Sequence, residues 1–398
     1  MGTRPRGAMV AVLIVLAHLI SVASCWAIGQ PTSLRARLAR LPSATMSISD
    51  PGGALTLLGG ALARSDSAEN SRDWQRVGNQ WLRLPPSTPW AVVHFVGGAG
   101  LGSAPQLCYD ALWADVCDRA SVAVIATPYD VAPDHAQLAA ECMAGFESAR
   151  AEACELGLLP AAAPVFRAGH SLGAKLLVVE ACRVVAGEAG DEVYAGSAPA
   201  PLGLLAYNNF GVADSVRLAS SVVQNMQGGG ARAGRTASAI ADAFAFAQQM
   251  GGASGFNLEF SPSPSELQAR VATSYSAPST RLFCFETSDG QRDELDCSDE
   301  LIASIQNCTL PSAGPTERIT LPGTHLAPAS VKVDLSELDA TLASLLGART
   351  FSLGDEAAVR AVGDALVTWL WPGGMAPPPT RALQASELGA DADGTIDV

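Results

Sequence analysis

Short apolar runs alternate along the chain with longer stretches in which apolar residues recur at helical spacing. The apolar runs occupy residues 91–96, 122–126 and 165–168, and further short strands are expected at 281–285 and 317–321, with a less certain one inside 192–208. Helical spacing covers residues 105–119, 135–155, 174–182, 265–275 and 356–371. A short run that is apolar throughout is typical of a parallel strand buried on both faces. The alternation therefore predicts an α/β fold, in which helices flank a mostly parallel sheet.

Weaker patterns predict how the rest of the chain is organised. Residues 74–84 alternate as an edge strand or hairpin would, and a mostly helical segment at 210–265 interrupts the strands as a lid insertion. We place a single domain at 73–372. A poorly ordered approach precedes it at 50–72, and a disordered acidic tail follows at 373–398.

The composition narrows the set of partners. Among 398 residues, 39 acidic against 25 basic side chains give a net charge of −14, which argues against a nucleic-acid surface. The nine cysteines include no C-x-x-C pair and no cluster with zinc-ligand spacing, so we expect neither a disulfide scaffold nor a metal site. Most should be small buried hydrophobic residues, with Cys297 and Cys308 in a polar stretch as the pair exposed to oxidation.

The first 49 residues have the composition of targeting signals. Residues 1–25 combine a basic start, an apolar stretch at 8–20 and small residues before Trp26, as a secretory signal peptide does. Residues 26–49 contain arginines and serines but no acidic residue, which is the composition of a transit peptide. Together they predict a bipartite presequence for a plastid (chloroplast). The alternative is a secreted protein or one of the endomembrane lumen.

One stretch carries a catalytic pattern. Gly169-His-Ser-Leu-Gly173 matches G-x-S-x-G, with an apolar run before it and helical spacing after it. Ser171 then lies on a sharp turn between strand and helix, as in the nucleophile elbow of an α/β-hydrolase. Glycines on either side allow strand and helix to approach closely, and the helix directs N–H groups towards the serine. The expected fold is thus an α/β-hydrolase fold with a helical lid insertion.

Chain order restricts the partners of this serine. In the α/β-hydrolase triad the serine comes first, then the acid, then the histidine. Of the five histidines only His325 lies downstream of Ser171, in a loop after a short strand, so it is the predicted base. The acid should follow the strand at 281–285. Four aspartates qualify there: Asp289, Asp293, Asp296 and Asp299.

An oxyanion hole needs two backbone N–H donors. We expect one at Leu172, directly after the nucleophile, and the other in the glycine-rich loop after the first buried strand, at Gly98 or Ala99.

Three other polar residues near these motifs are better explained by structural roles. His94 falls in the middle of a strand and should pack in the core. His135 heads a helix as a capping or packing residue, and Lys175, one turn after Ser171, should be a surface or ion-pair residue.

Several short motifs, including the one around Ser171, together resemble one family. They lie between Trp74 and Pro328: His94-Phe-Val-Gly-Gly98, Ala126-Thr-Pro-Tyr129, Asp134-His135, Gly169-His-Ser-Leu-Gly-Ala-Lys175, Tyr207-Asn-Asn-Phe210, Phe260-Ser-Pro-Ser-Pro264, Asp293-Glu-Leu-Asp296, and Leu321-Pro-Gly-Thr-His325 with Pro328. The set is similar to that of the α/β-hydrolase-like "domain of unknown function 1350" group of cyanobacteria and plant plastids. The resemblance implies a plastid setting, supports Ser171 and His325, and narrows the acid to Asp293 or Asp296. This chain departs from the family by inserting residues 287–292 between the strand and the acidic motif.

The resulting hypothesis is a serine hydrolase, of the esterase, lipase or thioesterase type. It would use Ser171, His325 and Asp293, with Asp296 as the alternative acid, and needs no cofactor or metal. We expect a small-molecule or lipid acyl ester as substrate, because the alanine-rich segment at 237–246 suits a lipidic acyl group. Peripheral contact with a membrane is left open. Two other functions are left open as well: an acyltransferase, and a non-catalytic assembly or scaffold protein of the plastid.

Overall fold

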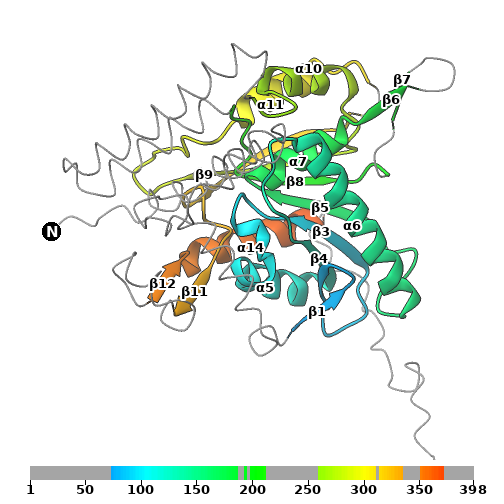
Figure 1. Cartoon of the computed structure of the whole chain (residues 1–398). Helices are drawn as coiled ribbons and strands as arrows, with labels where there is room; N and C mark the ends of the chain where they lie inside the picture. Colours follow the sequence, from blue (N-terminus) through cyan, green and yellow to red (C-terminus); the bar gives the residue numbers. More distant parts are fainter. Residues whose placement is uncertain are drawn as a thin grey trace, which may run out of the picture.

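The computed structural model of the chain describes residues 73–186, 192–194, 198–211, 259–310, 313–334 and 350–371. In this part of the chain an eight-stranded sheet, with the order β1-β2-β4-β3-β5-β8-β9-β10, forms the centre of the molecule (Figure 1). Its strands are β1 (Trp74–Val77), β2 (Gln80–Arg83), β3 (Ala91–Val96), β4 (Val122–Thr127), β5 (Val165–His170), β8 (Leu202–Leu205), β9 (Thr280–Glu286) and β10 (Thr316–Pro322). The β1-β2 and β2-β4 pairs are antiparallel and the other pairs are parallel. The predicted mostly parallel α/β sheet is confirmed.

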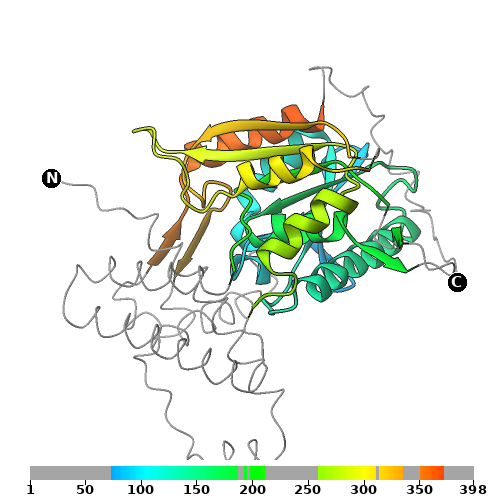
Figure 2. The same cartoon turned by 90° about the horizontal axis from the view of Figure 1, so that it is seen from above.

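Helices cover both faces of this sheet. They are η1 (Leu101–Ser103), α4 (Pro105–Cys108), α5 (Asp110–Ala120), α6 (His135–Glu155), α7 (Leu172–Ala181), α10 (Pro264–Ser274), α11 (Ser298–Gln306) and α14 (Glu356–Leu370). Helices α5 and α14 pack against each other on one face, while α6, α7, α10 and α11 cover the other (Figure 2). Within the described segments, no helix combines the length and apolar character needed to cross a bilayer.

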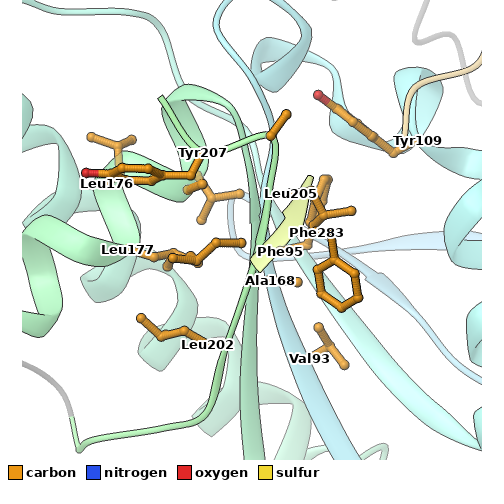
Figure 3. Close-up of a cluster of buried hydrophobic side chains, with 14 of the residues drawn as sticks. Val93, Phe95, Tyr109, Ala168, Leu176, Leu177, Leu202, Leu205, Tyr207 and Phe283 are labelled. Atoms are coloured by element: carbon orange, nitrogen blue, oxygen red, sulfur yellow. The ribbon is translucent and has the colours of Figure 1, made fainter. Parts of the chain in front are cut away.

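The core explains why the central strands are apolar throughout. All six residues of β3 and all six of β4 are buried, because helices cover both faces. Leu176 and Leu177 of α7 lie on one side of the strands, and Val93 and Phe283 lie on the other side (Figure 3). The helix that follows Ser171 is therefore fixed to the sheet by apolar packing.

Side-chain caps define where several helices begin. Asp134 caps α6 by accepting the N–H of Gln137 at 2.9 Å, so the predicted start at residue 135 is confirmed. At α10, Ser263 and Glu266 form a reciprocal capping box, and the helix begins at residue 264, one residue before the predicted start.

Three local features differ from the sequence prediction. The helix expected over 105–119 is divided at Tyr109 into α4 and α5. The strand expected within 192–208 is two strands: β8, in the main sheet, and β7 (Glu192–Tyr194), which pairs with β6 (Val184–Ala186). A hairpin of β11 (Val331–Asp334) and β12 (Thr350–Leu353) follows the main sheet, where no strand was predicted.

The two described residues that border the gap at 212–258 lie close together. Gly211 and Glu259, the described residues on either side of the gap, lie so close that a Cβ on Gly211 would stand 2.9 Å from a carboxylate oxygen of Glu259. Residues 212–258, and with them most of the predicted lid, lie outside the described residues. The same holds for the predicted presequence and approach at 1–72 and for the tail at 373–398.

Candidate active site

Ser171 occupies a strained turn between β5 and α7. Its backbone has φ 54° and ψ −117°, which a residue with a side chain rarely adopts. Both flanking glycines are required by close contacts. A Cβ on Gly173 would lie 2.0 Å from the carbonyl oxygen of Val96, and a Cβ on Gly169 would lie 2.7 Å from the backbone of α7. The structure thus forms the sharp strand–turn–helix elbow that the G-x-S-x-G motif predicts.

The structure brings Ser171, His325 and Asp293 into one hydrogen-bonded chain. His325 Nε2 lies 2.9 Å from Ser171 Oγ, and His325 Nδ1 lies 2.7 Å from Asp293 Oδ2. The side chains of His325 and Asp293 are each 5% exposed. A carboxylate only accepts hydrogen bonds, so Nδ1 carries the proton and the bare Nε2 accepts the Ser171 hydroxyl. These are the orientations that a serine nucleophile and its base require.

Electrostatics keep Asp293 ionised. Burial by itself raises the pKa of this carboxyl, but the electrostatic interaction and the hydrogen bond with His325 outweigh burial, and the pKa lies below its ordinary value. Asp293 can therefore hold the imidazole in one tautomer and stabilise its protonated form.

The four candidate aspartates have different hydrogen-bond partners. Asp289 is bonded to the Thr287 hydroxyl, Asp296 accepts the N–H of Ser298 at 2.9 Å, and Asp299 pairs with Arg318 and Arg292. Among the four, only Asp293 is within hydrogen-bonding distance of His325 in the described structure.

Residues 287–292, which the family resemblance indicates as an insertion, do not carry Asp293 away from His325. Thr287 N–H donates to Gln291 O at 2.9 Å, and Glu286 forms an antiparallel bridge with Arg292. The insertion folds back on itself, and the N–H of Asp293 then donates to the carbonyl of Phe285 at 3.0 Å. Asp293 therefore stands directly beside the end of β9.

The expected oxyanion donors are placed differently. Leu172 is the first residue of α7, where backbone N–H groups have no acceptor within the helix, and the helix dipole favours negative charge there. Gly98, in contrast, donates its N–H to the Tyr109 hydroxyl at 2.8 Å. The prediction that the Gly98 N–H faces the substrate therefore disagrees with this structure, because a buried tyrosine already accepts it. Ala99 is the neighbouring candidate in the same loop.

Tyr109 and His170 link the Gly98 loop to the His325 loop. His170 Nε2 lies 2.7 Å from the backbone carbonyl of His325, and His170 Nδ1 lies 2.8 Å from the Tyr109 hydroxyl. The carbonyl only accepts, so Nε2 carries the proton and Nδ1 accepts the tyrosine O–H. Burial, followed by the nearby His325, lowers the pKa of His170 to about 3, which keeps this ring neutral.

Asn208 is a site residue that the sequence analysis did not identify. Its Nδ2 donates to Ser171 Oγ at 2.9 Å, from the turn that follows β8. The Tyr207-Asn-Asn-Phe210 motif was the available signal. The spacing of this motif does not indicate a role at the serine, because the contact exists only when β8 lies beside β5.

The remaining polar residues pack as follows. His94 is fully buried, bonded to Thr127 Oγ1 at 2.9 Å and stacked on Phe146, as expected. His135 is also buried and stacks on Phe260, so it packs rather than caps.

Lys175 corrects the prediction of a surface residue. It is 1% exposed, its Nζ donates to the Phe210 carbonyl at 3.4 Å, and burial lowers its pKa to about 8.

Cys297 is another correction. It is buried and Cys308 is half-buried, so they are not an exposed pair, and both thiols are free. Among the described residues, no group of three or more His, Cys, Asp or Glu side chains could hold a metal ion.

The strand order, the elbow after β5 and the position of His325 after the last strand of the main sheet define this chain as an α/β-hydrolase-fold protein. The family model "Protein of unknown function (DUF1350)" matches residues 73–345, and the chain belongs to that family. The resemblance seen in its motifs is confirmed at the level of the family. No functionally curated protein matches the chain.

Solved structures with similar chains include several esterases. Esterase LipW from Mycobacterium marinum is 17% identical, with 84% of this chain and 93% of that chain covered and a TM-score of 0.41. Esterase 2 of Thermogutta terrifontis, phosphoramylated by tabun, is 14% identical, with 78% and 99% covered and a TM-score of 0.40. Carboxyl esterase 2 from the mycorrhizal fungus Tuber melanosporum is 14% identical, with 77% and 88% covered and a TM-score of 0.39.

Proposed function

We propose that this protein is a serine hydrolase that cleaves acyl esters or thioesters through Ser171, His325 and Asp293. One observation carries the proposal: a strained serine, a histidine and a buried carboxylate form a continuous hydrogen-bonded chain at 2.9 Å and 2.7 Å. The three groups come from three different loops at the carboxyl edge of the sheet. A protein that only scaffolds an assembly has no physical need for this arrangement.

The geometry implies a two-step acyl transfer. Ser171 Oγ attacks the carbonyl carbon of the substrate while its proton moves to His325 Nε2. His325 then gives this proton to the departing alcohol or thiol, and the acyl group remains on Oγ. Water attacks the acyl-enzyme with the same histidine as base, and the carboxylic acid leaves.

Asp293 supports both steps without transferring a proton. Its carboxylate accepts the Nδ1–H of His325 and stabilises the imidazolium that forms during attack. The Leu172 N–H, at the N-terminus of α7, is positioned to donate to the oxyanion of the tetrahedral intermediate.

The proposal is tested by covalent labelling of the purified full chain. A fluorophosphonate probe should label the wild type and not Ser171→Ala. Ser121→Ala is the matched control, because Ser121 also has a positive φ but lies at the opposite end of the sheet, just before β4. A folded wild type that resists the probe, or a Ser171→Ala variant that is still labelled, contradicts the proposal.

Acyl transfer to another acceptor is the second candidate, because it shares the acyl-enzyme and differs only in what removes the acyl group. We measure turnover of three substrates. Comparing p-nitrophenyl acetate with p-nitrophenyl octanoate gives the preference for acyl chain length, and butyryl-coenzyme A tests a thiol leaving group. Repeating each assay with added methanol or glycerol then measures transfer against hydrolysis. We favour hydrolysis, because water is the acceptor always present.

A further inference from the structure

We propose that Asn208 is a catalytic residue: its side-chain amide holds Ser171 Oγ in the attacking orientation and stabilises the negative charge of the tetrahedral intermediate. This inference rests on the proposed function, since it assigns a role at the same serine. It differs from the usual arrangement of this fold, in which two backbone N–H groups form the oxyanion hole.

The amide orientation follows from the single proton of the serine. Ser171 donates its hydroxyl hydrogen to His325 Nε2 and has none left to offer Asn208. The contact of 2.9 Å between Asn208 and Oγ must therefore be an N–H donated by Nδ2, not a hydroxyl donated to Oδ1. During attack the negative charge accumulates on the carbonyl oxygen, so the N–H bound to Oγ orients the serine, and stabilisation of the oxyanion falls to an N–H directed at that oxygen.

The Gly98 N–H, one of the two donors expected from the loop after β3, is already engaged, so the Asn208 amide can serve as a further donor. Gly98 N–H donates to the Tyr109 hydroxyl, which is held in turn by His170. The Asn208 amide carries two hydrogens, of which one reaches Oγ. The second is available for the oxyanion, which is bonded to the same carbon as Oγ once attack has occurred.

The backbone around Asn208 is fixed at several points. Ala206 has φ 47°, which a residue with a Cβ rarely adopts, and its N–H donates to the Phe283 carbonyl. The carbonyl of Tyr207 accepts the N–H of Cys297 at 2.8 Å. A donor held in this way needs little reorganisation when charge develops, which is what makes oxyanion donors effective.

The neighbouring asparagine, Asn209, has a different contact from Asn208. Asn209 is 5% exposed, and its Nδ2 donates to the carbonyl of Pro264 at 3.1 Å, away from the serine. Asn208 is more exposed than Asn209, as a group that meets substrate must be. Two adjacent asparagine side chains thus have different partners: Asn208 contacts Ser171, and Asn209 contacts the backbone at Pro264.

This pair supplies the experiment. Wild type, Asn208→Ala, Asn208→Asp, Asn209→Ala and Ser171→Ala are purified as full chains and compared by circular dichroism and urea unfolding. The kcat and KM for a p-nitrophenyl ester and the rate and endpoint of fluorophosphonate labelling are then measured. Asn208→Asp keeps the size of the side chain but offers an acceptor where the amide offers a donor.

We expect Asn208→Ala to lower kcat about 10²- to 10³-fold with KM within about threefold of wild type, the effect of removing one oxyanion donor. Labelling should slow similarly yet reach the same endpoint, and Asn208→Asp should be slower still. Asn209→Ala should lower the urea midpoint and keep kcat within about threefold of wild type.

Three results overturn the inference. The first is a kcat for Asn208→Ala within about threefold of wild type. The second is a loss of activity in Asn208→Ala that merely follows a loss of stability shared with Asn209→Ala. The third is a wild type that the probe does not label, which overturns the proposed function as well. Labelling of the wild type combined with full activity of Asn208→Ala overturns this inference alone.

Discussion

His170 donates its Nε2–H to the backbone carbonyl of His325 at 2.7 Å. His170, the residue before Ser171, thereby holds the loop of His325, while Tyr109, on the other ring nitrogen of His170, holds the loop that follows β3. Three segments far apart in sequence are joined by one buried imidazole. The alignment of Ser171 with His325 therefore depends on groups that never touch the substrate.

Tyr109→Phe tests this linkage. The variant leaves His170 Nδ1 and the Gly98 N–H without a partner in a fully buried site, so we expect a loss of about 2 kcal/mol or more in the free energy of unfolding. Activity should fall about 10- to 10²-fold, because small displacements of a base are costly. Tyr275→Phe is the control, since the Tyr275 hydroxyl is buried against Thr280 away from the site. It should lose stability and keep its activity; equal kinetic losses in both variants would remove any special role for Tyr109.

Asp293→Asn and Asp296→Asn separate the two aspartates that the family resemblance leaves open. Asp293→Asn should lower kcat about 10³- to 10⁴-fold, because an amide can hold His325 in the wrong tautomer. Asp296→Asn should change kcat less than about threefold. It weakens the turn at Ser298 and should cost about 1 kcal/mol of stability. The values of kcat with a p-nitrophenyl ester and urea midpoints measure both effects, and the reverse order of activities would reassign the acid.

Gly173→Ala tests the close approach at the elbow. The new Cβ would stand 2.0 Å from the Val96 carbonyl oxygen, so strand and helix must separate, at a cost of about 3 kcal/mol or more. Gly157→Ala is the comparison, because Gly157 has φ 71° but open space around its Cβ position. It should cost only about 1–2 kcal/mol for the left-handed backbone. Equal unfolding free energies for the two variants in urea would contradict the contact argument.

The stability of the protein should depend on pH through two buried histidines. Burial is the main reason that the pKa of His170 falls from 6.5 to about 3, and burial with Arg167 places the pKa of His94 well below 6.5. Below pH 6.5 the unfolded chain binds protons that the folded chain does not, so stability is present above 6.5 and is lost as the pH falls towards 3. Each histidine contributes up to about 1.4 kcal/mol per pH unit. Urea midpoints from pH 7.5 to 4.5 should fall, less steeply in His94→Gln; a flat profile contradicts this.

The sequence was sufficient to predict the elbow and to select His325 as the candidate base. An apolar run before the motif and helical spacing after it specify the strand–turn–helix, and His325 is the histidine that chain order allows. It was insufficient for the acid. Which aspartate reaches His325 depends on how residues 287–292 close, and the bonds of Thr287 that close them have no periodic signature.

Residues that act through distant partners were also out of reach. Asn208 and Tyr109 acquire their contacts only when β8 and the α4–α5 junction are placed beside the elbow. Lys175 was misjudged for a related reason. Its helical position is compatible with solvent, but the described structure places Phe210 and Phe260 against its ammonium. The local sequence pattern predicts which face of a helix a residue occupies. It does not predict which segments from elsewhere in the chain pack against that residue.

The adjacency of Gly211 and Glu259 has an evolutionary consequence. Because the chain departs from the body and rejoins it at one point, the length of the intervening segment does not alter the pairing of β8 with β9. Relatives can therefore lengthen, shorten or exchange residues 212–258 while Ser171, His325 and Asp293 keep their alignment.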